Sequence, residues 1–178
     1  NTYDVILSKG LNILGVRDTG SADLSRAEGH SDFTKVNFEA SRTQGLGNVP
    51  FSLKIGVAGQ YAFSELLSSE EMGYGGPMFG RAYDNSEITG DSGIKTSLEL
   101  AHDPFMVAKH VIMQPFMFYD FAKLWNLDTN SKPLTGSSAG LGVRTLLWDK
   151  VSLTTTLSQP LTRSQSNPLY GNGKNPRF

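Results

Sequence analysis

The sequence predicts an all-β chain, an antiparallel meander that forms part of a transmembrane β-barrel. Stretches of about ten residues alternate between apolar and polar side chains, and Gly, Pro, Asn, Asp or Ser bound them. This length suits tilted crossings of a bilayer, which need about 9–11 residues, whereas strands of soluble sandwiches have about 5–6. Short and long connections occur along the chain, as they do in outer-membrane barrels.

The first three strands are expected at 3–14, 34–41 and 51–63. The alternation is weak in the first strand and clear in the other two. The apolar face of the third strand carries Phe51, Leu53, Ile55, Val57, Tyr61 and Phe63. Small and polar residues occupy its opposite face, as expected of a strand between two different environments.

Four more strands are expected at 94–101, 110–121, 139–147 and 151–158, and the alternation is weakest in 110–121. Across the chain, the polar faces carry Lys35, Glu39, Lys54, Gln60, Lys95, Glu99 and Arg144. These side chains face either bulk water outside a sandwich or the aqueous lumen of a barrel. The alternation leaves both interpretations open.

The connections have two lengths. Residues 46–50 and 148–150 are predicted to form tight turns, whereas 15–31, 64–92 and 122–136 are long and polar. Short turns at one rim and long loops at the other are typical of outer-membrane barrels. Trp125 and Trp148 lie near strand ends, either in an interfacial aromatic girdle or as ordinary packing residues.

Composition excludes several classes of protein. No window approaches the ~18 consecutive apolar residues of a transmembrane helix. The net charge of −1 does not indicate a general nucleic-acid binder, and the absence of cysteine excludes disulfides and thiolate metal sites. The first residues, Asn1-Thr2-Tyr3, show no signal peptide, so we expect the chain to start inside an exported gene product.

The connection 64–92 is the most specific stretch of the sequence. A Gly75-Gly76 pair leads to a tip, Gly80-Arg81-Ala82-Tyr83-Asp84, and then to Gly90-Asp91-Ser92-Gly93 before a strand that ends Leu98-Glu99-Leu100. This order resembles the conserved loop of TpsB transporters, the ShlB/FhaC-like haemolysin-activator family related to BamA. Ala82 stands where that family usually has glycine. Because alanine tolerates positive φ poorly, we expect the tip backbone to depart from the family pattern there.

A second match follows one strand later. Gln114-Pro115-Phe116-Met117-Phe118-Tyr119-Asp120 resembles the strand of this family that ends in an aromatic residue and an aspartate. In that family the loop folds into the lumen and its tip arginine pairs with the aspartate, so the resemblance implies a pair between Arg81 and Asp120. A guanidinium in a confined lumen needs such a carboxylate. The alternative is that Arg81 is an ordinary solvated loop residue.

The resemblance implies a complete set of site residues. The lumen-loop residues are Gly75, Gly76, Gly80, Arg81, Tyr83, Asp84, Gly90, Asp91 and Gly93, and the wall residues are Asp120 and Phe118. The chain 1–178 then supplies about 7–8 strands of the C-terminal part of a sixteen-stranded barrel, with the other strands and the periplasmic domains lying outside it. Phe178 is either the terminal assembly signal of such proteins or the place where the chain was cut.

The same resemblance implies the setting of the protein. It is expected in the outer membrane of a Gram-negative bacterium, where it exports a TpsA-like exoprotein, a haemolysin or adhesin, without nucleotide hydrolysis. Its other expected partners are outer-membrane lipid and the assembly machinery of that membrane, and no nucleic acid is expected.

No catalytic residue, metal or cofactor is expected. Gly90-Asp91-Ser92-Gly93 mimics the nucleophile segment of trypsin-like proteases, but a serine nucleophile needs a histidine base, and His30, His102 and His110 lie in no base motif. A turn before a strand explains the four residues better. Two other functions remain open, a BamA-like insertase and a soluble β-sandwich binding module.

Overall fold

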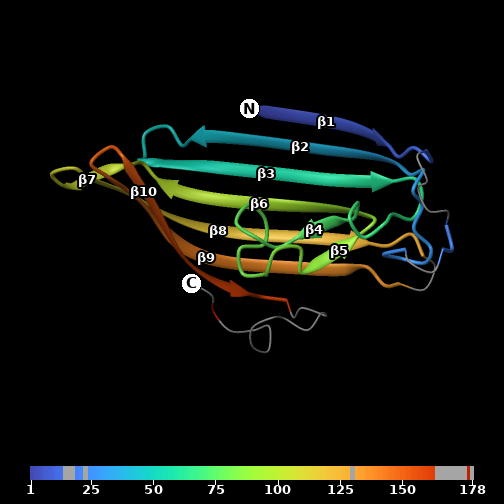
Figure 1. The fold of residues 1–178 in the computed structure, drawn as a ribbon. Coiled ribbons are helices and arrows are strands. Elements are labelled where there is room, and N and C mark those ends of the chain that lie inside the picture. Colours follow the sequence, from blue (N-terminus) through green and yellow to red (C-terminus); the bar gives the residue numbers. More distant parts are fainter. Residues whose placement is uncertain (14–18, 22–23, 129–130, 163–175, 177–178) are drawn as a thin grey trace.

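The computed structural model describes residues 1–13, 19–21, 24–128, 131–162 and 176. Its strands are β1 (Thr2–Lys9), β2 (Thr34–Gly45), β3 (Phe51–Ala62), β4 (Met72–Tyr74), β5 (Ile88–Gly90), β6 (Ser92–His102), β7 (Phe105–Ala108), β8 (Val111–Trp125), β9 (Leu134–Leu147) and β10 (Val151–Pro160). The main sheet has the order β1-β2-β3-β6-β8-β9-β10, with β7 paired to β8, and β4 and β5 form a separate pair (Figure 1). All these pairs are antiparallel, so the predicted all-β meander is confirmed.

The seven predicted strands are all present, but several ends were placed wrongly. β1 stops at Lys9, and 10–13 form no strand, while position 14 lies outside the described residues. β8 and β9 pair continuously from Val111↔Leu147 to Leu124↔Leu134, which shortens the connection predicted at 122–136 to 126–133. Each added antiparallel pair satisfies further backbone groups, and this gain extends the strands beyond the clearly alternating sequence. The short strands β4, β5 and β7 were missed, the first two inside the connection predicted at 64–92.

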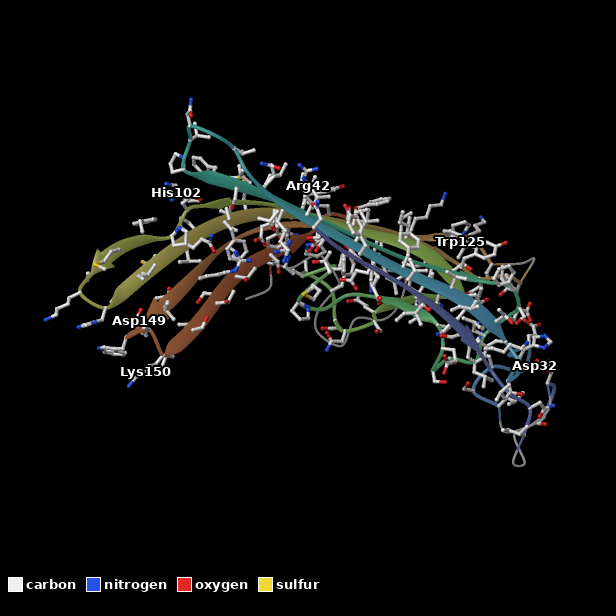
Figure 2. All side chains as sticks on the ribbon, turned by 90° about the horizontal axis from the view of Figure 1, so that it is seen from above. Asp32, Arg42, His102, Trp125, Asp149 and Lys150 are labelled. Atoms are coloured by element: carbon white, nitrogen blue, oxygen red, sulfur yellow. The ribbon has the colours of Figure 1, made fainter. Side chains whose placement is uncertain are left out.

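The main sheet is curved, and the segment 63–91 lies beneath its concave face (Figure 2). The convex face carries large apolar side chains that remain exposed: Leu98, Met117, Tyr119, Leu141, Leu153 and Leu157. One curved sheet with an exposed apolar face differs from the two packed sheets of a sandwich. Among the described residues, none lies in a helix with the length and apolarity needed to span a membrane.

The main apolar core lies between the concave face and the segment that covers it. Ala58, Ala122 and Leu124 come from the sheet, and the covering segment adds Met72, Tyr74, Phe79, Tyr83 and Ile88. All eight side chains are buried. The segment 63–91 therefore contributes most of this core and is an integral part of the fold.

Candidate functional site

The segment 63–91, called the inner loop below, crosses the concave face as a folded unit. Its two short strands pair Met72 with Gly90 and Tyr74 with Ile88, and its tip lies at 76–84. Tyr74 is fully buried, and its ring centroid lies 5.3 Å from that of Tyr83. This apolar packing fixes the position from which the charged tip meets the wall.

The side chain of Arg81 extends from the tip to several hydrogen-bond acceptors on the concave face of β6, β8, β9 and β10, called the wall below. Its Nε and Nη2 donate to the two oxygens of Asp120 at 3.1 and 2.9 Å, and its Nη1 donates to Oε2 of Glu99 at 2.7 Å. Nη2 also donates to Ser97 Oγ at 3.0 Å, and the guanidinium carbon lies 3.5 Å from the centroid of the Phe118 ring. The planar guanidinium thus uses its forked donors and its flat face at once, a combination that lysine cannot reproduce.

Asp120 binds the backbone of the tip as well as its side chain. Oδ2 accepts hydrogen bonds from the N–H groups of Gly80 and Arg81 at 3.1 and 3.0 Å, and the carboxylate is fully buried. Burial lowers the pKa of Arg81, but the hydrogen bonds and charges of Asp120 and Glu99 outweigh this effect, so the pKa lies above its ordinary value. Arg81 is therefore charged and anchored through both its side chain and its main chain.

Strand register brings these acceptors together. Ser97 on β6 pairs with Asp120 on β8, which pairs with Ser138 on β9. Two residues further along β6, a second row consists of Glu99, Phe118, Gly140 and Ser158. Because alternate residues of a strand share a face, both rows point to the concave side. The tip docks on these two rows, and Ser158 Oγ donates to the carbonyl oxygen of Arg81 at 2.9 Å.

A second arginine belongs to the same charge network. Arg144 of β9 donates to Oε1 of Glu99 at 2.7 Å, and its guanidinium carbon lies 4.2 Å from the centroid of the Phe116 ring. Glu99 thus lies between the two arginines, with one oxygen for each. Two cations and the two carboxylates of Glu99 and Asp120 balance within the network, which lowers the cost of burying it.

Tyr83 connects the tip to β9 and to the segment that follows β10. Its phenol oxygen lies 3.1 Å from the carbonyl oxygen of Ser137 and 2.8 Å from that of Thr162, and it accepts from the Ser137 N–H at 3.3 Å. Thr162 follows β10, so this one side chain contacts both β9 and the segment after β10. The contact explains why an aromatic residue with a hydroxyl group occupies this position.

The tip glycines adopt conformations that other residues rarely do. Gly75, Gly76 and Gly80 have φ of +126°, +103° and +84°. A Cβ at Gly80 would also lie 2.8 Å from the Tyr74 ring, so both backbone and space require glycine there. Ala82 is 1% exposed and is not among the residues with positive φ, so the alanine fits without backbone strain.

The remaining predicted residues are Asp84, Gly90 and Asp91 on the inner loop and Gly93, which lies in β6. The N–H of Asp84 donates to Oε2 of Glu87 at 2.8 Å, in the return towards β5. Gly90 and Gly93 lie against Leu124 and its neighbours on β8, where a Cβ would come within about 3 Å of β8 atoms. Asp91 is fully buried at the base of the inner loop, where Arg26 and not Arg81 is its cationic partner.

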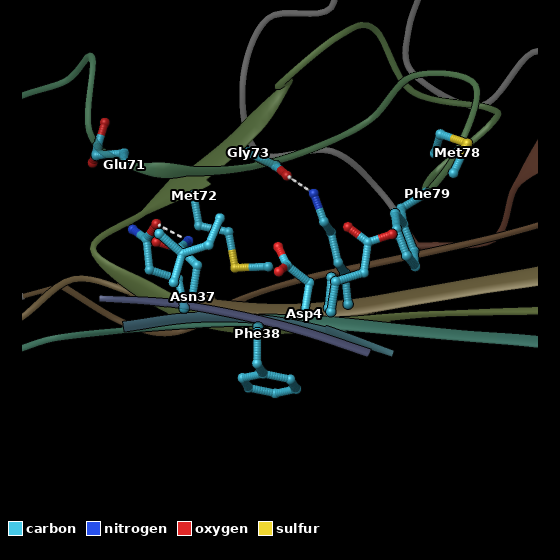
Figure 3. A pocket seen from close by; sticks show the side chains of 14 residues that line it. Asp4, Asn37, Phe38, Glu71, Met72, Gly73, Met78 and Phe79 are labelled. Carbon is cyan, nitrogen blue, oxygen red and sulfur yellow. Dashed lines mark hydrogen bonds between the residues drawn. The ribbon is translucent and has the colours of Figure 1, made fainter. Parts of the chain in front are cut away.

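The inner loop contacts β2 and β3 near its start, where Lys35 Nζ and Gln60 Nε2 donate to the Glu70 carbonyl oxygen at 2.8 and 3.1 Å. Beside these contacts, a cavity of about 420 Å³ lies between the inner loop and β1, β2 and β3, and Figure 3 shows Asp4 and Met72 pointing into it. Lys95 Nζ donates to the carbonyl oxygen of Gly73 at 3.1 Å across one side of it. Polar groups therefore line the open side of the inner loop, and its charged tip contacts β6, β8 and β10.

Sequence reasoning missed several members of the site. Glu99 and Arg144 were recognised only as polar strand residues, and Ser97 and Ser158 were not singled out. Their common signal is position on the polar face. Turning that signal into a site requires the register between strands, which a single sequence does not contain.

An antiparallel meander with an apolar convex face and a loop folded against its polar concave face fits part of a transmembrane β-barrel. Residues 2–144 match the family described as haemolysin secretion/activation protein ShlB/FhaC/HecB. The match covers well over half of the chain, and the chain belongs to this family. Its members are outer-membrane proteins of two-partner secretion, a form of protein transport. No curated protein matches the chain.

Proposed function

We propose that this chain supplies the wall and the lumen loop of an outer-membrane pore that exports one partner exoprotein without nucleotide hydrolysis. The strands carry their apolar side chains on the convex face, which suits contact with lipid, and the polar concave face suits a water-filled lumen. Export of an unfolded chain through such a pore requires no bond cleavage by these residues.

The observation that carries this proposal is the docking of Arg81 on Asp120 and Glu99. Desolvation opposes the attraction between the charges, so a buried network of this kind contributes little net stability. Its contribution is to fix the position of the tip. Holding a loop at a defined place in a pore is a role in which position matters. Family membership supports the same role.

The proposal includes further strands outside these residues. In lipid, unpaired backbone groups at a sheet edge are not satisfied, so β1 and β10 need strand partners in a membrane. A barrel closed by about eight strands has an interior filled by its own side chains, which leaves no room for the inner loop. A larger barrel, completed by other parts of the protein, accommodates it.

The test uses the full-length protein with Arg81→Ala or Asp120→Asn, and it scores both membrane insertion and secretion of the co-expressed partner. We expect both variants to insert normally, as judged by the heat modifiability of the folded barrel, and to secrete the partner much less. Arg42→Ala is the matched control, because Arg42 is an exposed arginine on the convex side of β2 (Figure 2). Secretion by Arg81→Ala at the level of this control would contradict the proposal.

The geometry also determines which rescue experiment is informative. Exchange of the charges between positions 81 and 120 is a poor rescue, because an arginine at 120 would face the backbone N–H groups of the tip, which need an acceptor.

The insertase alternative is tested in the same cells by measuring the levels of other outer-membrane barrels. A general loss of those barrels, in place of a selective loss of secretion, would favour that alternative.

A further inference from the structure

The base of the inner loop carries a second arginine–carboxylate contact, far from the tip. Arg26 lies in the connection between β1 and β2 and donates to Asp91, which directly precedes β6. The same guanidinium donates to the carbonyl oxygen of Leu66 at 3.0 Å and to Oε1 of Glu71 at 3.2 Å. Arg26 therefore bridges the two ends of the inner loop, since Leu66 is near its start and Asp91 closes it.

Asp91 joins three segments of the chain at this point. Its carboxylate accepts from the backbone N–H groups of Leu66 and Leu127, both at 2.9 Å, in addition to Arg26. Leu127 belongs to the connection between β8 and β9. A fully buried carboxylate with donors from three connections fixes their relative positions, because loss of any donor leaves charge unsatisfied.

The connection between β1 and β2 packs on the inner loop over more than this one residue. His30 N–H donates to the Glu65 carbonyl oxygen at 2.9 Å, and an isolated parallel bridge joins His30 to Leu66. Ser25 and Ser68 exchange two hydrogen bonds: the Ser68 N–H donates to Ser25 Oγ at 3.1 Å, and Ser68 Oγ donates to the Ser25 carbonyl oxygen at 3.3 Å. Residues 24–30, called the strap below, thus cover the start of the inner loop.

The two carboxylates near Arg26 are not equivalent. Burial raises the pKa of Glu71, and the charge of Arg26 offsets this effect only in part. Asp91, with its additional backbone donors, is therefore the principal acceptor. At the tip, Arg81 of the inner loop binds Asp120 of the sheet. At the base the roles are exchanged, because Arg26 of the strap binds Asp91 at the end of the inner loop.

We propose that Arg26 is a positioning residue for the pore loop: through Asp91 and Leu66, the strap holds the base of the inner loop in place while the tip docks on or leaves the wall. The inference rests on the proposed export function, since it assigns a role in that function to residues outside the loop. It divides the loop into a fixed base and a tip whose contacts are separate from those of the base.

The contact itself is tested first, in the full-length protein, by Ser25→Cys combined with Ser68→Cys. The 178 residues contain no native cysteine, so the new pair has no competitor among them. We expect a disulfide-linked peptide pair after proteolysis and mass spectrometry. Ser25→Cys with Ser152→Cys is the control, because Ser152 lies at the opposite end of the sheet, next to the turn before β10. Failure of the first pair to link would overturn the inference without touching the proposed function.

The role of Arg26 is tested by Arg26→Ala, with Lys132→Ala as a control for removal of an exposed cation from a connection at the same rim. We expect Arg26→Ala to insert normally and to reduce secretion roughly tenfold or more, the factor that corresponds to a lost charged hydrogen-bond contact. Purified Arg26→Ala protein in planar bilayers should also show larger conductance fluctuations than the unchanged protein.

Rescue decides between a fixed anchor and a contact that must open. With Ser25→Cys and Ser68→Cys in the Arg26→Ala protein, oxidation should restore secretion and quiet conductance, and a reductant should remove the rescue. In the unchanged background, the oxidised pair should leave secretion unaltered. If the disulfide blocks secretion, the strap must open during transport and the inference is wrong.

The two proposals fail in different ways. If Arg81→Ala reduces secretion while Arg26→Ala changes neither secretion nor conductance, the strap has no positioning role and the pore function stands. If the disulfide restores quiet conductance to Arg26→Ala but Arg81→Ala secretes normally, the positioning role stands and the export proposal fails.

Discussion

Replacement of Arg81 by lysine and by alanine separates the effect of charge from the effect of shape. Alanine leaves Asp120 and Glu99 with buried charge that the tip no longer balances, a change that costs about 3–5 kcal/mol when one partner of a buried pair is removed. This shifts the balance between docked and undocked tip by roughly 10²–10⁴-fold. Lysine keeps the charge but reaches only one of the two carboxylates.

The expected cost of lysine is smaller and can be worked from the contacts. Asp120 retains the two backbone donors of the tip, and Glu99 retains Arg144, so about one charged hydrogen-bond contact of ~1.5–3 kcal/mol is lost. The docked population should then fall by roughly 10- to 100-fold relative to the undocked population. Loss of the flat contact with Phe118 adds to this cost.

The assay is the labelling rate of a buried cysteine. Ser138→Cys introduces a near-isosteric thiol on β9, in the same register row as Asp120, at a position that is 0% exposed. Because a maleimide reacts only after local opening, its rate reports the free energy of that opening. The expected order of rates is Arg81→Ala, then Arg81→Lys, then Arg81, with Arg42→Ala equal to the last. A lysine variant that labels no faster than the arginine protein would refute the argument from guanidinium geometry.

Three further predictions concern the inner loop. Tyr83→Phe removes the phenol's hydrogen bonds to the Ser137 and Thr162 carbonyl oxygens, while the Ser137 N–H keeps Thr162 Oγ1 as an acceptor at 2.7 Å. It should cost about 0.5–1.5 kcal/mol, seen as a lower midpoint of heat-induced unfolding in detergent; an unchanged midpoint contradicts the contact. Gly80→Ala should cost more than Gly47→Ala although both have positive φ, because only position 80 lacks space for a Cβ; equal midpoints would show that the Tyr74 ring yields freely. Glu71→Gln should be close to neutral and Asp91→Asn strongly destabilising, with stability compared by the same unfolding midpoint. The small effect expected of Glu71→Gln follows from the raised pKa of Glu71 in the folded protein, because folding then disfavours the charged form of this carboxyl group. The contribution of Glu71 to the free energy of unfolding therefore becomes more favourable as the pH falls towards that pKa. A large loss in Glu71→Gln would contradict this sign.

Alternation predicted the meander because each strand separates two different environments along its whole length. The pattern located β3 almost to the residue, since Phe51–Ala62 has clear contrast between its faces. It failed at β7, where Phe105, Met106, Val107 and Ala108 are all exposed and no contrast exists to read. It also underestimated β8 and β9, because the alternation of Ala122, Lys123 and Leu124 at the end of β8 is too short to be distinguished from the polar connection that follows.

The site was predictable only where a local motif carries it. Gly80, Arg81 and Tyr83 are close in sequence, so a resemblance to a known loop identifies them together. Arg26 is 65 positions from Asp91, and no spacing rule connects two residues whose contact depends on the docking of separate connections. Glu99 and Arg144 are 45 positions apart and meet only through the register of β6, β8 and β9.

The absence of side chains at Gly136, Gly140 and Gly142 of β9 leaves the space that aromatic rings fill. A Cβ at these positions would lie 2.4 Å from the Tyr74 ring, 2.5 Å from Phe118 and 2.3 Å from Phe116. The rings of Phe118 and Phe116 in turn support the guanidinium groups of Arg81 and Arg144. In relatives of this chain, each glycine and its aromatic partner should therefore change together, a pairwise covariation that an alignment can measure. A relative with a side chain at the position of Gly140 or Gly142 must place the arginine above the displaced ring differently. These two glycines therefore indicate which family members hold the inner loop in the same way.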